Sequence, residues 1–322
     1  MKTNIENPAN YTNTDSFPYK VILDTDLCQK IVNEKFIPPV HVEISPTNKC
    51  NLNCSFCSYS SRDKQIELNL SELKEIIGIC KSLGTKAITI SGGGEPLCHP
   101  HINDFIQYCK ETNIQVGLIT NGLLLNKLTS NSLQSLKWCR VSYGDGRTNF
   151  EKFKQIIMSV IPLNPSIDWG FSYVVTDNPD YNNQIQLVKM ANELKVSHVK
   201  FASDISNQAN IDLNECRAKI LEHGINIDLV QFHHKNQSSI GCKECRVSLL
   251  RPVISANGLV YPCCSSQYFL DYSSNLGHYT DLINIINNGK FFNGSICKNC
   301  FYWRYNELLN VMIHGLKHSD WL

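Results

Sequence analysis

Short apolar runs alternate with helix-length amphipathic segments from residue 40 to about residue 230. The runs are rich in Val, Ile and Thr and bounded by polar turns, which is typical of strands. They predict strands over residues 40–45, 86–91, 114–120, 138–142, 168–176 and 197–202, with a weaker strand over 225–230. Apolar residues at helical spacing predict helices over residues 71–83, 100–112, 123–136, 149–161, 181–195 and 212–223. We expect Ser71 to cap the first of these helices and Gly84 to end it.

This alternation predicts an α/β fold, in which a parallel sheet is covered by helices. Six strand–helix units are enough for a partial (β/α)6 TIM-like barrel, although periodicity alone does not separate a barrel from a doubly wound sheet. In a barrel, the functional side chains come from the carboxyl ends of the strands and the loops that follow them.

The pattern changes near residue 233, where cysteines, glycines and short strands over 249–255 and 258–261 replace the long helices. A final helix is predicted over residues 303–317. We therefore predict an N-terminal extension of residues 1–39, a main α/β domain of residues 40–232 and a small metal-stabilised domain of residues 233–322.

The composition narrows the functional class. The 30 Lys and Arg residues balance 29 Asp and Glu residues, which argues against a long nucleic-acid partner. No apolar segment of signal-peptide type begins the chain, and no run approaches the roughly 20 apolar residues of a membrane span. We expect a soluble cytoplasmic protein with no membrane partner, in which 15 cysteines serve metal or redox chemistry rather than disulfides.

The first cysteine cluster is Cys50, Cys54 and Cys57, spaced C-x3-C-x2-C directly after the first predicted strand. Three thiolates on one loop can hold three irons of a [4Fe–4S] cluster and leave the fourth iron open to a small chelating molecule. The alternative is a structural or zinc site, which closes with a fourth ligand such as His41.

A glycine run over residues 91–96, SGGGEP, follows the second predicted strand. It is either an ordinary tight turn or a place where bare backbone approaches a ligand and presents carbonyls to an ammonium group. Thr120 and Ser142 lie at the ends of the third and fourth predicted strands. They serve either turn formation or hydrogen bonds to a carboxylate or ribose.

With Phe56 before its third cysteine, the first cluster resembles the signature of the radical S-adenosylmethionine (SAM) superfamily, and the glycine run is similar to that family's GGE(P) motif. The resemblance implies that the open iron binds the amino and carboxylate groups of SAM. It places Phe56 near the adenine and makes Gly92, Gly93, Gly94, Glu95, Thr120 and Ser142 SAM contacts. One electron, from a reductant such as flavodoxin or ferredoxin, then yields methionine and a 5′-deoxyadenosyl radical.

One motif departs from the family pattern. The usual S-x-D-G at the fourth strand is one residue longer here, Ser142-Tyr143-Gly144-Asp145-Gly146, so Asp145 has no assigned role.

The second cysteine cluster lies in the C-terminal region and comprises Cys242, Cys245, Cys263, Cys264, Cys297 and Cys300. With the segment around it, this cluster resembles the SPASM/twitch appendages of radical SAM enzymes, which bind auxiliary [4Fe–4S] clusters. By similarity to the twitch domain of an aminocyclitol dehydrogenase, the preferred ligands are Cys245, Cys263, Cys297 and Cys300, with Cys242 and Cys264 as alternatives. A structural zinc ribbon is the competing interpretation. Four cysteine ligands would give an electron-carrying cluster, whereas three would leave an iron open to substrate.

Together these features predict a radical SAM oxidoreductase that dehydrogenates a small polar metabolite, with the auxiliary cluster as electron acceptor. The alternatives are modification of a ribosomal peptide, modification of a nucleoside or nucleotide, and a non-enzymatic iron–sulfur carrier. Oxidation at carbon also needs a base, but no catalytic residue is assigned, because each candidate is more typical of a surface or packing position. The candidates are His233, His234, Lys200, Tyr173 and Arg251.

Overall fold

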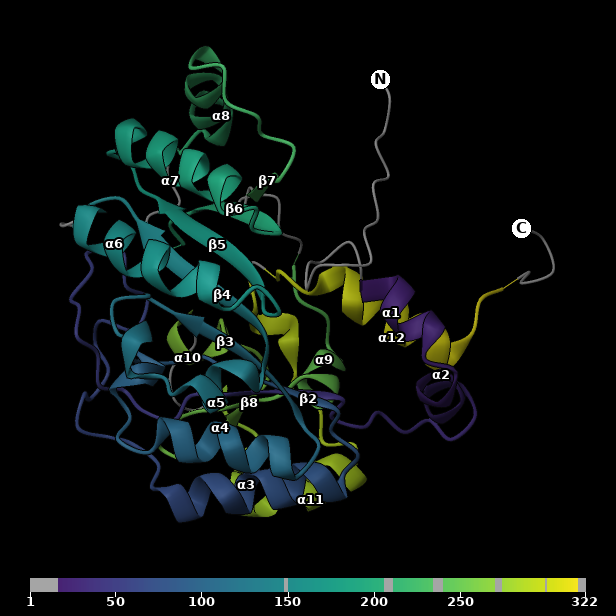
Figure 1. The fold of residues 1–322 in the computed structure, drawn as a ribbon. Helices are drawn as coiled ribbons and strands as arrows, with labels where there is room; N and C mark the ends of the chain where they lie inside the picture. Colours follow the sequence, from purple (N-terminus) through teal and green to yellow (C-terminus); the bar gives the residue numbers. More distant parts are fainter. Residues whose placement is uncertain are drawn as a thin grey trace.

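The computed structural model describes residues 17–147, 150–205, 211–233, 240–269, 274–298 and 300–317 (Figure 1). The strands are β1 (His41–Ile44), β2 (Ala87–Ile90), β3 (Gln115–Thr120), β4 (Leu136–Gly144), β5 (Asp168–Val175), β6 (His198–Ser203), β7 (Val230–His233), β8 (Val253–Ile254), β9 (Leu259–Tyr261) and β10 (Gly277–His278). The α-helices are α1 (Phe17–Leu23), α2 (Thr25–Val32), α3 (Leu70–Ser82), α4 (Ile102–Glu111), α5 (Ser130–Gln134), α6 (Phe150–Val160), α7 (Tyr181–Glu193), α8 (Leu213–Glu222), α9 (Val247–Leu250), α10 (Ser266–Phe269), α11 (Leu282–Asn287) and α12 (Trp303–His314). Short 3-10 turns are η2 (Pro96–Cys98), η3 (Leu125–Lys127), η4 (Ile161–Leu163), η6 (Tyr279–Asp281) and η7 (Gly294–Ile296).

All ten strands belong to one sheet, ordered β10-β9-β8-β1-β2-β3-β4-β5-β6-β7. Strands β1 to β7 are parallel and follow one another in chain order, and β8 adds in parallel to the free side of β1. The sheet does not close on itself, so the predicted partial TIM-like barrel is confirmed. The chain order of the strands excludes the doubly wound arrangement, in which the strand order reverses within the sheet.

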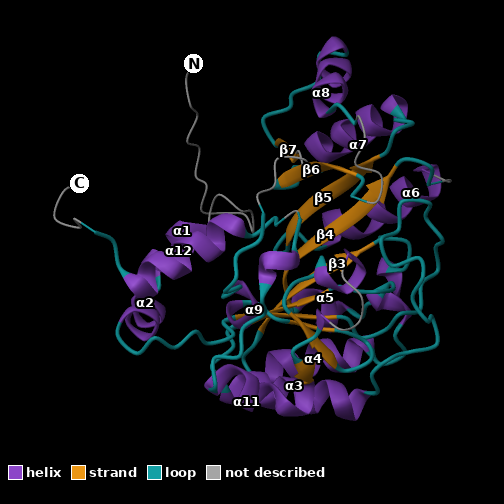
Figure 2. Ribbon diagram, turned by 180° about the vertical axis from the view of Figure 1, so that it is seen from behind, coloured by secondary structure: helices purple, strands orange, loops and turns teal. Residues whose placement is uncertain are grey.

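Side chains alternate between the two faces of the sheet, as strand geometry requires. On β4, Tyr143 points outward, and its ring contacts the rings of Phe150 and Phe153 on α6 at 5.3 and 4.8 Å between centroids. Helices α3, α4, α6, α7 and α8 cover this outer face, and the apolar core lies between them and the sheet (Figure 2). The half-buried Arg140 and Ser142 therefore face the inside of the barrel.

Several predicted elements differ in detail. Asn69, not Ser71, caps α3, because its side chain accepts from the Glu72 N–H while the Glu72 carboxylate accepts from the Asn69 N–H. Gly84 follows the helix with φ +84°, as expected of a terminating glycine. The helix predicted over 123–136 is wrong: the chain forms η3 and then α5, which restarts where the Thr129 hydroxyl caps the Ser132 N–H.

Two other predicted strands also differ from the structure, one in where it begins and one in being divided between a helix and a strand. The weak strand predicted over 225–230 is β7, which begins only at Val230. The strand predicted over 249–255 is the end of α9 followed by the two-residue β8.

Residues 17–35, to which the sequence assigned no role, pack against α12. Helices α1 and α2 lie beside α12 in both views (Figures 1 and 2). The rings of Phe17 and Tyr305 are stacked with centroids 3.6 Å apart, and Lys35 Nζ donates to the Ile313 carbonyl at 2.5 Å. Strands β8–β10 continue the barrel sheet, so the domain boundary at residue 233 stays a prediction. Within the residues described, no helix is both long and apolar enough to span a membrane.

The reciprocal cap of α3 gives a first prediction. Replacing Asn69 by Ala removes the acceptor for the Glu72 N–H, and we expect the free energy of unfolding to fall by about 1 kcal/mol. Ser71→Ala, two residues into the helix, is the matched control and should leave stability nearly unchanged. Urea denaturation of both variants measures the difference. Equal losses for both variants would contradict the assignment of the cap.

Candidate active site

The loop after β1 carries the three cysteines of the first cluster, Cys50, Cys54 and Cys57, all of them half-buried. The Cys57 N–H donates to the Cys54 carbonyl at 3.1 Å, and the Leu52 N–H donates to Cys50 Sγ at 3.4 Å. Burial raises the pKa of the Cys50 thiol, an effect that the Leu52 N–H opposes. The loop thus presents its three sulfurs within eight residues, on the carboxyl side of the first barrel strand.

Two guanidinium groups contact these sulfurs, and the sequence had singled out neither. Arg147 Nε lies 3.2 Å from Cys54 Sγ, and its guanidinium lies 5.5 Å from the centroid of the Phe56 ring. Arg62 Nη1 lies 3.5 Å from Cys57 Sγ. Two cations at these positions offset the negative charge that three thiolate ligands would bring to a partly buried site.

The glycine run lies directly against the segment that leads into Cys50. The Gly94 N–H donates to the Thr47 carbonyl at 3.0 Å, and the Glu95 N–H donates to the Lys49 carbonyl at 2.8 Å. A Cβ at Gly93 would clash with the Asn48 side chain, and one at Gly94 would clash with the backbone of residues 48 and 49. Glycine is required here because two backbone segments touch.

Glu95 is buried, and its carboxylate holds strand ends together. It accepts hydrogen bonds from Thr120 Oγ1 at 2.7 Å, from the Asn121 N–H at 2.7 Å and from the Leu97 N–H at 3.1 Å. Burial raises the pKa of Glu95, and these hydrogen bonds oppose the rise. Asn121 Nδ2 in turn donates to Asn51 Oδ1 at 2.7 Å, inside the cysteine loop. Glu95 and Thr120 satisfy each other here, and their predicted contact with SAM stays a prediction.

Phe56 and Ser142 both lie near the carboxyl end of β4. A Cβ at Gly144 would clash with the Phe56 ring, so the ring lies directly on this glycine. Ser142 Oγ is 2.9 Å from Ser172 Oγ on β5. The predicted SAM contacts Phe56 and Ser142 are therefore brought to the same edge of the sheet as the three cysteines.

Asp145 has a structural role. Its carboxylate is buried and accepts from the Tyr173 hydroxyl at 2.5 Å, the Thr176 N–H at 2.8 Å and the Asp180 N–H at 2.9 Å. It thereby orders the connection between β5 and α7. Burial and the neighbouring Asp145 raise the pKa of Tyr173 far above its usual value, so this candidate base is held protonated.

A polar network lies on the inner face of β1, where Arg251 enters from the C-terminal region. Its guanidinium donates to Glu43 Oε2 at 3.1 Å, His41 Nδ1 at 3.1 Å and the Tyr302 hydroxyl at 2.9 Å. Burial, followed by the charge of Arg251, holds the pKa of His41 well below its usual value. His41 is therefore neutral, accepts at Nδ1 and donates from Nε2 to Thr89 Oγ1 at 2.8 Å, which removes it as a ligand of the first cysteine cluster.

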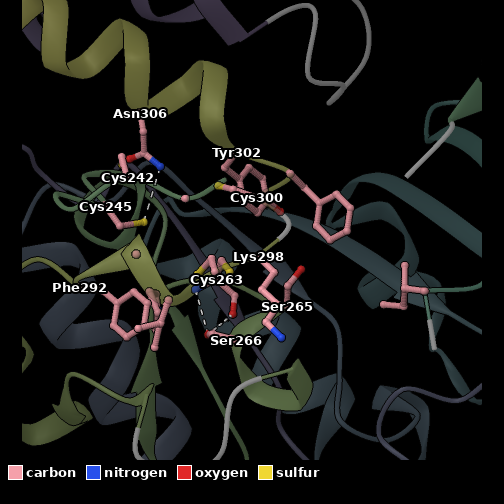
Figure 3. Close-up of a pocket in the computed structure, with 17 residues that line it drawn as sticks. Cys242, Cys245, Cys263, Ser265, Ser266, Phe292, Lys298, Cys300, Tyr302 and Asn306 are labelled. Carbon is pink, nitrogen blue, oxygen red and sulfur yellow. Dashed lines mark hydrogen bonds between the residues drawn. The ribbon is translucent and has the colours of Figure 1, made fainter. Parts of the chain in front are cut away.

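The C-terminal cysteines surround a cavity of about 520 Å³ (Figure 3). The backbone brings their two C-x2-C pairs together, since the Gly241 N–H donates to the Cys297 carbonyl at 2.9 Å. In the described parts of the chain, no three Cys, His, Asp or Glu side chains are close enough to hold a single metal ion. The thiols enclose a volume instead of meeting at one point. The cysteines that line it are Cys242, Cys245, Cys263, Cys297 and Cys300.

These thiols influence one another. Burial raises the pKa of Cys245 to about 12, and the nearby Cys300 and Cys242 add to the rise. Burial likewise raises the pKa of Cys300 to about 11. The predicted alternative Cys242 lines the cavity with the four preferred ligands, whereas Cys264 lies outside it, with Sγ 3.4 Å from the Tyr302 hydroxyl.

Of the remaining candidate bases, Arg251 takes part in the network on β1, whereas Lys200 and His233 lie on the inner face of the barrel. Lys200 on β6 pairs in register with Ser172 of β5. His233 on β7 pairs with Ala202 of β6, which pairs with Val174 of β5. His234 lies outside the described residues.

Comparison with known proteins decides the family. Residues 44–144, which span the cysteine loop, the glycine run and the end of β4, match the family described as the Radical SAM superfamily. The chain therefore contains a radical SAM domain over these residues. A GTP 3′,8-cyclase from Chlorobaculum tepidum is 32% identical over 103 residues, 31% of each chain. A probable GTP 3′,8-cyclase from Methanococcus maripaludis is 24% identical over 256 residues, 68% of this chain and 83% of the relative.

The fold of this protein has a counterpart among solved structures. SuiB of Streptococcus suis, bound to S-adenosylmethionine, superposes with a TM-score of 0.60 over 85% of this chain and 71% of its own, at 18% identity. This likeness concerns the fold. Among the curated relatives, the alignment with the Chlorobaculum enzyme spans less than a third of that enzyme's length.

The residues present fit the groups that the family binds. Three partly exposed thiols on one loop suit a cluster that keeps an open iron, and the guanidinium groups of Arg62 and Arg147 would offset its negative charge. Cys50, Cys54 and Cys57 would hold the cluster, which would bind SAM at its open iron.

The structural role of Asp145 gives a second prediction. Asp145→Asn replaces one acceptor oxygen by a donor that faces N–H groups, and we expect the free energy of unfolding to fall by about 2–3 kcal/mol. Asp168→Asn, at the exposed start of β5, is the matched control and should have little effect. Anaerobic denaturation measures stability, and equilibrium binding measures SAM affinity. Normal stability with lost SAM affinity in Asp145→Asn would show that the carboxylate serves the cofactor instead.

Proposed function

We propose that this enzyme cleaves SAM reductively, abstracts a hydrogen atom from a small polar substrate inside the barrel, and completes a dehydrogenation with an auxiliary [4Fe–4S] cluster as electron acceptor. The cluster on Cys50, Cys54 and Cys57 would supply the electron that breaks the sulfonium C–S bond. A reductant such as flavodoxin or ferredoxin, and the cytoplasmic location, remain part of this proposal.

The proposal is supported by the side chains that lie between the cysteine cavity and the barrel interior. Tyr302 lines the cavity, while its hydroxyl accepts from Arg251, which also reaches Glu43 inside the barrel. On the other side, the Tyr59 hydroxyl donates to the Cys264 carbonyl at 3.2 Å, which connects the cavity segment to the first cysteine loop. An electron acceptor in this cavity would stand one side-chain layer from a substrate in the barrel.

The electron balance explains why a second cluster is useful. The 5′-deoxyadenosyl radical takes one hydrogen atom from a substrate C–H bond and becomes 5′-deoxyadenosine. The substrate radical then loses a proton to a base and one electron to the auxiliary cluster, and a double bond to carbon forms. His233, which pairs in register with Ala202 of β6 on the inner face of the barrel, would receive the proton. The thiols of Cys245, Cys263, Cys297 and Cys300, with Cys242 beside them, would hold the acceptor.

A nucleotide substrate is the second candidate. It is favoured by the likeness to the Methanococcus protein named a probable GTP 3′,8-cyclase, which extends over 83% of that protein. Such a reaction would be redox-neutral and would need no electron acceptor in the cavity. For the peptide alternative, SuiB has been solved with its precursor peptide SuiA, but at 18% identity this likeness extends only to the fold.

The third prediction tests SAM cleavage. Anaerobically reconstituted enzyme with SAM and dithionite should release methionine and 5′-deoxyadenosine, which chromatography detects. The Cys50→Ala/Cys54→Ala/Cys57→Ala variant should release neither, because it lacks the thiolates that hold the cluster. Cys28→Ala, a half-buried cysteine outside both clusters, should behave as the wild type. Equal release from the triple variant would exclude this loop as the SAM site.

The fourth prediction tests the electron acceptor. After dithionite reduction, the triple variant should keep an electron paramagnetic resonance signal that SAM does not change, because it arises from the second cluster. Adding Cys245→Ala and Cys300→Ala should abolish that signal, whereas Cys28→Ala and Cys98→Ala should not. A triple variant with no signal but one bound zinc ion would overturn the oxidation and favour the redox-neutral nucleotide reaction.

A further inference from the structure

The inner face of β4, β5 and β6 carries two rows of polar side chains across the barrel. In one row, Arg140 pairs in register with Gly170, which pairs with His198. In the next row, closer to the cysteine loop, Ser142, Ser172 and Lys200 are aligned in the same way. A Cβ at Gly170 would clash with the His198 ring, so this imidazole lies over β5.

Arg140 is the group in this patch that lacks an acceptor. Its guanidinium lies 5.9 Å from the centroid of the Trp138 ring. Nevertheless, it donates no hydrogen bond to any residue that the structure describes. Glu43, the carboxylate whose charge acts on it most, is already engaged by Arg251 at 3.1 Å. A guanidinium carries five N–H donors, and leaving them unmet away from bulk water is costly.

The neighbours of Arg140 offer its guanidinium no acceptor of its own. Burial and then the charges of Arg140 and Lys200 lower the pKa of His198 to about 4, so its imidazole is neutral near pH 7. Of the carboxylates near these strands, Asp168 is exposed at the first residue of β5, and the buried Asp204 follows the end of β6. Since Glu43 is engaged by Arg251, a bound anion would supply the acceptor that Arg140 lacks.

The depth of Arg140 separates this patch from the SAM region. Gly144, which touches the Phe56 ring of the cysteine loop, lies four residues further along β4. At about 3.3 Å per residue, Arg140 is roughly 13 Å deeper in the barrel. A separate molecule in the barrel would therefore reach Arg140 without displacing the ring of Phe56 from Gly144.

We infer that Arg140, with Lys200 and the hydroxyls of Ser142 and Ser172 beside it, is the subsite that binds a carboxylate or phosphate group of the substrate. The inference rests on the proposed function in taking the barrel interior as the substrate site. Planar guanidinium donors match either anion with two parallel hydrogen bonds. The substrate class is thus a small polar molecule with at least one anionic group.

Calorimetric titration of anaerobically reconstituted enzyme tests this subsite, with inorganic phosphate and acetate as separate probes at constant ionic strength. At least one probe should bind the wild type, and Arg140→Gln should weaken it about tenfold or more. Arg140→Lys should lose less, since it keeps the charge. Arg217→Gln, on the exposed face of α8, is the control and should bind as the wild type. The stronger probe identifies the anion as phosphate or carboxylate.

Three results would overturn the inference. They are no binding of either probe to the wild type, equal binding by Arg140→Gln and the wild type, and a loss of SAM affinity in Arg140→Gln as large as the loss of anion affinity. Iron content and circular dichroism show whether each variant is folded, and Arg140→Lys serves if the Gln variant is not. Release of 5′-deoxyadenosine by the wild type is measured separately, so failure of the subsite is distinguished from failure of the proposed function.

Discussion

One buried carboxylate, that of Glu95, joins the ends of β2 and β3 to the cysteine loop. Its three hydrogen bonds to Thr120, Asn121 and Leu97 offset the cost of burying an acidic group. Asn121 extends the connection to Asn51, and the glycine turn before Glu95 rests on residues 47–49. The position of the three cysteine sulfurs relative to the barrel therefore depends on a contact that tolerates neither a side chain on the glycines nor loss of the acid.

An ion pair between Arg251 and Glu43 connects the barrel with the C-terminal region. Arg251 reaches Glu43 on β1 and Tyr302 at the cysteine cavity, while β8 extends the sheet beside β1. The two cysteine-bearing regions thereby adjoin one continuous sheet, even though about 200 residues separate their sequences. This arrangement supports an oxidation of the substrate, because only one layer of side chains would separate a substrate in the barrel from an electron acceptor in the cavity.

Local patterns predicted much of this structure. Alternating hydrophobicity located the barrel strands. The spacing of Cys50, Cys54 and Cys57 and the glycine run indicated the matched radical SAM domain, whereas the individual SAM contacts stay predictions. Alternation on β4 also contained the signal for Arg140, which shares its face with Ser142. Arg147 had no such signal, because its contact with Cys54 depends on how the turn after β4 folds back on a loop 93 residues away.

Other features depended on choices that composition does not reveal. Asn69 and Ser71 are both acceptable helix caps, and only the reciprocal bond with Glu72 selects the former. Asp145 was similarly open, because its partners Tyr173, Thr176 and Asp180 come from the next strand and loop.

Iron and sulfide content per chain, measured after anaerobic reconstitution, tests most directly the claim that one sheet carries two separate clusters. The wild type should contain about eight irons, and either Cys50→Ala/Cys54→Ala/Cys57→Ala or Cys245→Ala/Cys263→Ala/Cys297→Ala/Cys300→Ala should contain about four. A wild type with about four irons that fall to none in the first variant would contradict the account, since the C-terminal cysteines would then hold no cluster.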